Sequence, residues 1–143
     1  MLNFKNIHIG NLIGQQITGN GIEISRICNF MNCTEEEIKH MISSESLPTD
    51  ILLKWSKLLE YDFFRLYSQH LILFAPPSAH NKTKKQKSTL PQFRKNIYSK
   101  EVIDFCLEQI ATGKMTKNKV IERYGIPKTT LYKWISKYGK MTN

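Results

Sequence analysis

The sequence predicts an all-α protein made of two small helical modules joined by a basic linker. Apolar residues recur at the three- and four-residue spacing of amphipathic helices in the first half of the chain and again near its C-terminus. Between these stretches Pro76 and Pro77 cannot continue a helix, and a lysine-rich run without apolar anchors follows them. We therefore expect modules over 1–74 and 99–143, with a Pro- and Lys-rich linker over 75–98.

Five helices are expected in the first module, each marked by its own apolar stripe. Thr34 and Glu37 match a capping box that begins the third helix, because each side chain can bond the backbone N–H of the other residue. Gly19 to Gly21 ends the first helix, and Asn32 with Cys33 forms the turn after the second. The stripes are Ile9, Leu12, Ile13 and Ile17; Ile24, Ile27, Cys28 and Met31; Ile38, Met41 and Ile42; Ile51, Leu52, Trp55, Leu58 and Leu59; and the apolar run over 63–74.

Three helices are expected in the second module. The first carries the stripe Val102 to Ile110, and Thr116 is an N-cap for the second, over 117–124. Gly125 supplies the positive φ that closes this helix, and Pro127 suits the start of the third helix, over 128–137. Two short helices joined by such a turn and packed on a first helix form a helix-turn-helix motif, which places its last helix in the DNA major groove.

The charge is unevenly distributed along the chain. The 21 Lys and Arg residues and 12 Asp and Glu residues give a net charge of +9. Residues 1–79 have a net charge of −2, whereas residues 80–143 have a net charge of +11. A surplus of this size attracts a polyanion, and the usual polyanion in the cytosol is nucleic acid. The alternative is that these lysines only form a solvated surface.

The last predicted helix offers a face for contacting DNA. Leu131, Trp134, Ile135 and Tyr138 form its inward stripe, which leaves the opposite face for a groove. Thr and Lys side chains can hydrogen-bond base edges, and lysines of the linker would add affinity for the phosphate backbone. The candidate DNA-binding residues are Lys128, Thr129, Thr130, Tyr132, Lys133, Ser136 and Lys137 on this helix and Lys82, Lys84, Lys85 and Lys87 in the linker.

The stretch Val120-Ile121-Glu122-Arg123-Tyr124-Gly125-Ile126-Pro127-Lys128-Thr129-Thr130-Leu131-Tyr132-Lys133-Trp134-Ile135 resembles the helix-turn-helix domain of insertion-sequence transposases and their accessory proteins. The resemblance covers about 98–139, and Pro127 departs from it where a Ser or Thr cap is commoner. It implies a transposase-like accessory or regulatory protein of a bacterial mobile element, with a separate transposase as one candidate partner.

The first module is similar to the Cro/Xre repressor-like helix-turn-helix domain over about 8–68. The stretch Leu-Leu-Lys-Trp-Ser-Lys-Leu-Leu-Glu-Tyr-Asp over 52–62 carries this similarity. The expected recognition helix departs from it, because it opens with Glu35, Glu36 and Glu37, which DNA phosphates would repel. We therefore favour association over a second DNA-reading role. The excess of apolar residues over 63–74 suggests a homodimer formed through this module.

No catalytic, metal-binding or cofactor-binding motif is found in the sequence. Cys28, Cys33 and Cys106 fit reduced structural thiols, and no glycine-rich phosphate loop or His-Glu-x-x-His motif is present. With no signal peptide or membrane span recognised, we expect a non-enzymatic, cytoplasmic, nucleoid-associated protein that binds double-stranded DNA sequence-specifically. The alternatives are a transcriptional regulator with two helix-turn-helix heads and an adaptor that binds an acidic protein or RNA.

Overall fold

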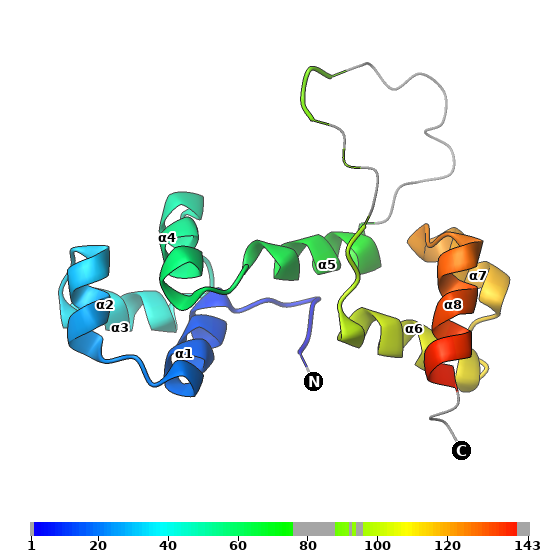
Figure 1. The fold of residues 1–143 in the computed structure, drawn as a ribbon, viewed down its shortest axis with the longest axis horizontal. Helices are drawn as coiled ribbons and strands as arrows, with labels where there is room; N and C mark the ends of the chain where they lie inside the picture. Colours follow the sequence, from blue (N-terminus) through cyan, green and yellow to red (C-terminus); the bar gives the residue numbers. More distant parts are fainter. Residues whose placement is uncertain (1, 76–87, 92, 94–95, 140–143) are drawn as a thin grey trace. The chain divides into compact units, whose positions relative to one another are not determined.

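The computed structural model describes residues 2–75, 88–91, 93 and 96–139, and within these ranges the fold is all-α. Figure 1 shows the helices in chain order, and they confirm the expected architecture of small helical modules. The helices are α1 (Ile9–Asn20), α2 (Ile24–Met31), α3 (Glu35–Ser43), α4 (Thr49–Leu59), α5 (Phe64–Phe74), α6 (Lys100–Ala111), α7 (Lys117–Tyr124) and α8 (Lys128–Tyr138).

The chain divides into two compact units, and the division falls inside α5. The first unit is Asn3–Tyr67, and the second continues from Ser68 to the C-terminal helices. The sequence, in contrast, places the end of the first module after Phe74. The reason for the difference is Gln69, whose buried carboxamide bonds the backbone just before α6, so the second half of α5 belongs with α6 to α8.

The first unit is built on a tight contact between the start of α1 and the end of α3. The backbone N–H of Ile9 donates to the carbonyl of Glu45, and that of Gly10 donates to Ser44, both at 3.1 Å. A Cβ on Gly10 would collide with three backbone carbonyl oxygens, so only glycine permits this approach. The fully buried core of the unit consists of Ile9, Ile13, Ile27, Ile38, Trp55 and Phe63.

Local sequence signals set the helix ends in this unit as expected. The side chain of Thr34 accepts from the N–H of Glu37, and the Glu37 carboxylate accepts from the N–H of Thr34 at 2.8 Å, which completes the capping box. Asn32 ends α2 in the left-handed region with a φ of 54°. This conformation reverses the chain between α2 and α3, where the sequence predicts a turn.

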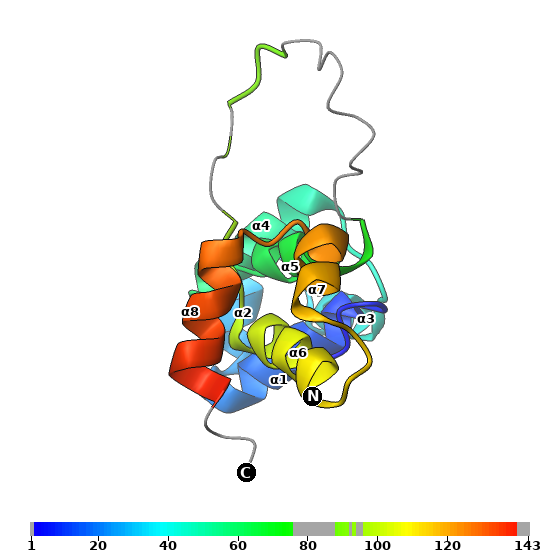
Figure 2. The same ribbon diagram turned by 90° about the vertical axis from the view of Figure 1, so that its right-hand side faces the viewer.

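In the second unit α6, α7 and α8 pack against one another around a small apolar core (Figure 2). Ser99 caps α6 and Thr116 caps α7, while Gly125, with a φ of 62°, closes α7 as expected. The rings of Tyr98 and Trp134 pack edge-to-face with their centroids 4.9 Å apart. This contact holds the segment before α6 against α8. The buried apolar residues of the unit are Ile72, Val102, Ile103, Cys106, Val120, Tyr124, Ile126, Leu131 and Trp134.

Candidate nucleic-acid interface

The orientation of α8 is set by its buried face. Leu131 is fully buried and Trp134 nearly so, and Ile126 in the preceding turn is buried as well. These contacts hold the helix against α6 and α7 and turn its other side outward. Of the candidate residues on this helix, Thr130 is half-buried, and the exposed ones are Lys128, Thr129, Tyr132, Lys133, Ser136 and Lys137.

Tyr132 is the aromatic centre of this outward face. Its side chain is 44% exposed, and two lysine ammonium groups lie over its ring. Lys117 Nζ is 5.4 Å and Lys128 Nζ is 5.7 Å from the ring centroid. Because each cation interacts with the electron-rich ring face, the tyrosine keeps two positive charges close together. The structure thus adds Lys117, at the start of α7, to the residues around the candidate face.

Positive charge is concentrated on α7 and α8. The two helices carry six basic residues and one acidic residue, Glu122. Within the described part of the chain the ion pairs are Arg65–Asp62 and Lys100–Asp104, neither of which involves α7 or α8. The cations of these helices are therefore not neutralised by ion pairs of the described residues, as a surface that attracts a polyanion requires.

A second basic feature surrounds the start of α7. A shallow hollow of about 490 Å³ is lined by Lys114, Lys119 and Arg123, together with Met115 and Glu122. Lys114, Lys119 and Arg123 are not among the residues that the sequence predicts to contact DNA, which lie on the last helix and in the linker. The clustering of Lys114, Lys117 and Lys119 around the Thr116 cap in the sequence already indicates a basic surface at the start of α7.

The sequence also offers candidates outside α7 and α8. Lys82, Lys84, Lys85 and Lys87 lie outside the described residues. Within the first unit the expected recognition helix, α3, has Glu35, Glu36 and Glu37 exposed in its first turn. Farther along the same helix Lys39, His40 and Ser43 are exposed as well.

The cysteines fit the structural role that the sequence predicts. Cys28 and Cys33 are half-buried, Cys106 is buried, and all three are free thiols. Desolvation in the core of the second unit raises the pKa of Cys106 to about 12, so this thiol stays protonated at neutral pH. Among the residues that the structure covers, no group of three or more His, Cys, Asp or Glu side chains is placed to hold a metal ion.

No helix of the described residues is long and apolar enough to cross a membrane. No protein-family model, curated protein or solved structure matches the chain. The resemblance of 98–139 to transposase helix-turn-helix domains, and that of 8–68 to Cro/Xre domains, therefore rests on the residues quoted above alone.

Proposed function

We propose that this chain binds double-stranded DNA sequence-specifically through α8 and has no catalytic role of its own. The observation that carries the proposal is the outward face of α8, which combines exposed hydroxyl and lysine side chains with a tyrosine flanked by two lysines. A single helix held on two others, with such a face outward, suits insertion in a major groove.

Different residues of this face would read bases and contact phosphates. Thr129, Lys133 and Ser136 lie along the middle of the face, where their donors and acceptors would meet base edges. Lys117 and Lys128 flank Tyr132 and would neutralise phosphates on either side of it, which positions the helix without reading sequence. Specificity would then depend on the first set, and most of the salt-dependent affinity on the second.

In its biological setting we propose an accessory or regulatory protein of a mobile element, located at the nucleoid and working beside a separate transposase. The first unit would pair two chains into a homodimer or recruit that partner, because its α3 presents three glutamates where a DNA reader needs neutral or positive residues. A transcriptional regulator with two reading heads is the second candidate, which the exposed Lys39, His40 and Ser43 of α3 favour.

Selection of bound fragments from randomised duplex DNA by the full chain tests the proposal. We expect a short enriched motif and an affinity that falls steeply as salt rises. Lys133→Ala should change the enriched motif, whereas Lys39→Ala, an exposed lysine on α3, should leave it unchanged. Binding without any enriched motif would reject sequence-specific reading. A motif altered by Lys39→Ala would favour the regulator with two heads, and binding to RNA or an acidic protein alone would favour the adaptor.

A further inference from the structure

Cys28 and Cys33 lie at the two ends of the turn that joins α2 to α3. The backbone N–H of Cys33 donates to the carbonyl of Cys28 at 3.2 Å, and the N–H of Asn32 donates to the same oxygen. Asn32 adopts the left-handed conformation, which reverses the chain after the helix. This pattern is the Schellman type of helix end, in which the side chains of the two residues joined by the longer hydrogen bond commonly pack together. The fold therefore brings the two thiols to one side of the turn.

The hydrogen bond also limits how far apart the two cysteines can be. With standard bond lengths, an N···O distance of 3.2 Å keeps the two Cα atoms no more than about 7 Å apart, and any bend in this path brings them closer. Disulfides in proteins join residues whose Cα atoms are about 4.4–6.8 Å apart. The backbone of the reduced chain is therefore already close to the geometry that a disulfide needs.

The electrostatic surroundings of Cys33 include the thiol of Cys28. Burial, the Glu37 carboxylate and the Cys28 thiol, in that order of size, raise the pKa of Cys33, while Lys54 acts in the opposite direction. Because coulombic interactions weaken with distance, the effect of Cys28 indicates that the two sulfurs lie close together. The raised pKa makes the Cys33 thiolate scarce, so Cys33 is a poor first target for an oxidant.

Both thiols of the turn can be reached from solvent. Cys28 and Cys33 are half-buried free thiols. Their neighbours Asn29, Asn32 and Thr34 are exposed, so the turn lies at the surface of the first unit. A small oxidant therefore has access to the pair without any opening of the fold.

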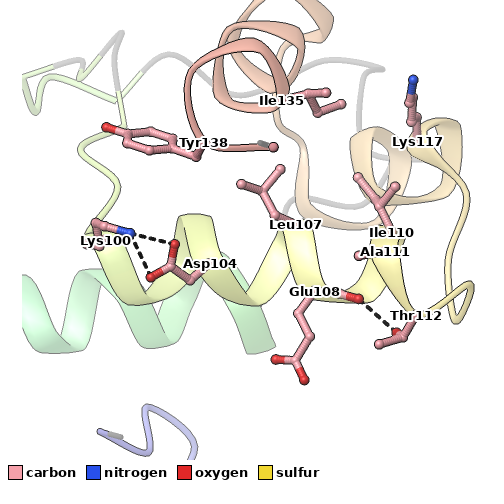
Figure 3. A pocket seen from close by; sticks show the side chains of 11 residues that line it. Lys100, Asp104, Leu107, Glu108, Ile110, Ala111, Thr112, Lys117, Ile135 and Tyr138 are labelled. Atoms are coloured by element: carbon pink, nitrogen blue, oxygen red, sulfur yellow. Dashed lines mark hydrogen bonds and ion pairs between the residues drawn. The ribbon is translucent and has the colours of Figure 1, made fainter. Parts of the chain in front are cut away.

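Cys106 differs from this pair in both proximity and access. It is fully buried, and no other cysteine belongs to the second unit. The groove between α6 and α8, with a volume of about 490 Å³, is lined on the α6 side by residues that include Leu107, Ile110 and Ala111 but not Cys106 (Figure 3). The groove therefore gives an oxidant no access to this thiol.

We propose that Cys28 and Cys33 form a reversible disulfide when the chain meets hydrogen peroxide, with Cys28 oxidised first and Cys33 closing the bond. The Cys28 sulfur attacks one peroxide oxygen and the O–O bond breaks, which leaves a sulfenic acid and releases the other oxygen as water with the thiol proton. The Cys33 sulfur then attacks the Cys28 sulfur, and the hydroxyl leaves as a second water with the Cys33 proton. The two thiols lose two electrons, which the peroxide gains, and a dithiol reductant reverses the change.

The disulfide would tie the end of α2 to the start of α3. Thr34 and Glu37 form the capping box of α3 directly after Cys33, so the cross-link would hold the turn and this capped end together. Cys106 takes no part, so the second unit would keep its structure. The proposal therefore does not depend on DNA binding by α8.

Mass spectrometry of the full chain after treatment with hydrogen peroxide tests the proposal. Cleavage after Arg26 and Lys39 releases one peptide that contains both cysteines of the turn, whereas Cys106 falls in another peptide. After free thiols are blocked with iodoacetamide, the 27–39 peptide should carry no block and be lighter by two hydrogen atoms, apart from any oxygen taken up by Met31. Dithiothreitol added before the block should restore both thiols. Two blocked thiols, or sulfinic acids in place of the disulfide, would overturn the proposal.

A mixture of isotope-labelled and unlabelled chains shows whether the bond forms within one chain. A further cleavage after Phe30 separates the two cysteines, so the fragments over 27–30 and 31–39 stay joined only through the disulfide. We expect joined fragments to carry the same label. Fragments joined across the two labels would mean that chains are oxidised to one another, which would reject a disulfide within the turn.

Variants of the full chain test the order of oxidation. Cys33→Ser should leave a sulfenic acid on Cys28, which dimedone labels, whereas Cys28→Ser should leave Cys33 with little label. Labelling of Cys33 in place of Cys28 would overturn the proposed order. Cys106→Ser is the matched control and should leave the yield of disulfide unchanged.

Circular dichroism tests whether the disulfide fits the turn. The oxidised wild-type chain should keep its helical signal and melt no lower than the reduced chain. Because peroxide also oxidises methionine, the double variant Cys28→Ser, Cys33→Ser treated in the same way is the control. A helical signal lost by the oxidised wild type and kept by the double variant would show that the bond distorts the turn, and would overturn the proposal.

Discussion

The carboxamide of Gln69 on α5 forms two hydrogen bonds with the backbone that leads into α6. Its Nε2 donates to the Ile97 carbonyl at 2.7 Å, and its Oε1 accepts from the Ser99 N–H at 2.9 Å. Gln69 is only 3% exposed, and Ser99 also caps α6 by accepting from Val102. The start of the second unit is therefore fixed by a residue that precedes it by thirty positions.

Replacing Gln69 with leucine should destabilise the second unit. The Ile97 carbonyl and the Ser99 N–H would lose their hydrogen-bond partner. Leaving buried polar groups without a partner should lower the free energy of unfolding by about 1–3 kcal/mol. Urea unfolding followed by tryptophan fluorescence would measure this loss, since Trp134 lies in that unit. Gln15→Leu on α1 is the control, because Gln15 is exposed and its loss should change stability by less than about 0.5 kcal/mol. Equal effects of the two substitutions would contradict a structural role for the carboxamide.

Two glycines of α1 should respond in opposite directions to alanine. Gly10→Ala would push a Cβ into backbone carbonyls of Met41, Ile42 and Ser44, so α1 and the end of α3 would have to separate. We expect a loss of several kcal/mol, on the order of other severe steric changes. A Cβ on Gly19 would meet no atom within 4 Å. Gly19→Ala should therefore stabilise the chain by about 0.5–1 kcal/mol, because alanine loses less conformational freedom than glycine in a helix. Thermal unfolding by circular dichroism would compare them, and similar melting temperatures would contradict the close approach at Gly10.

The three cysteines should differ in reactivity towards an alkylating reagent. Burial raises the pKa of Cys106 to about 12, so its thiolate is scarce until the pH approaches that value, and its sulfur is shielded as well. At mildly alkaline pH, Cys28 and Cys33 should be modified first and Cys106 only after denaturant is added. Mass spectrometry of digested protein would locate the labels. Fast labelling of Cys106 in the native chain would show that the core of the second unit opens readily.

Lysines around Tyr132 should contribute to DNA affinity without affecting sequence preference. If Lys117 and Lys128 contact phosphates, alanine at either position should weaken binding to all sequences alike and lower the slope of log K against log salt by about 1. Fluorescence anisotropy of labelled duplexes at several salt concentrations would measure the slope. Lys39→Ala on α3 serves as the control for a general change in net charge. A slope unchanged by Lys117→Ala would remove α7 from the proposed interface.

Helix positions could be predicted because the signals that set them are local. The capping box of Thr34 and Glu37, the Thr116 cap and the left-handed Gly125 each act within a few residues, and all three are present in the structure. The outward face of α8 also follows from local periodicity, since burying Leu131 and Trp134 leaves Lys133 and Ser136 exposed. These features require no knowledge of distant parts of the chain.

The sequence by itself determined the all-α fold, the division of charge and the exposed face of α8, because each depends on the order of neighbouring residues. Only the tertiary structure decided which unit takes the second half of α5, that Lys117 lies over Tyr132, and that α6 and α8 leave an apolar groove between them. Each of these depends on residues far apart in the sequence that meet through packing. Periodicity places Gln69 on a helix. Its hydrogen-bond partners, the Ile97 carbonyl and the Ser99 N–H, can be identified only in the folded chain, because they lie far from Gln69 in the sequence.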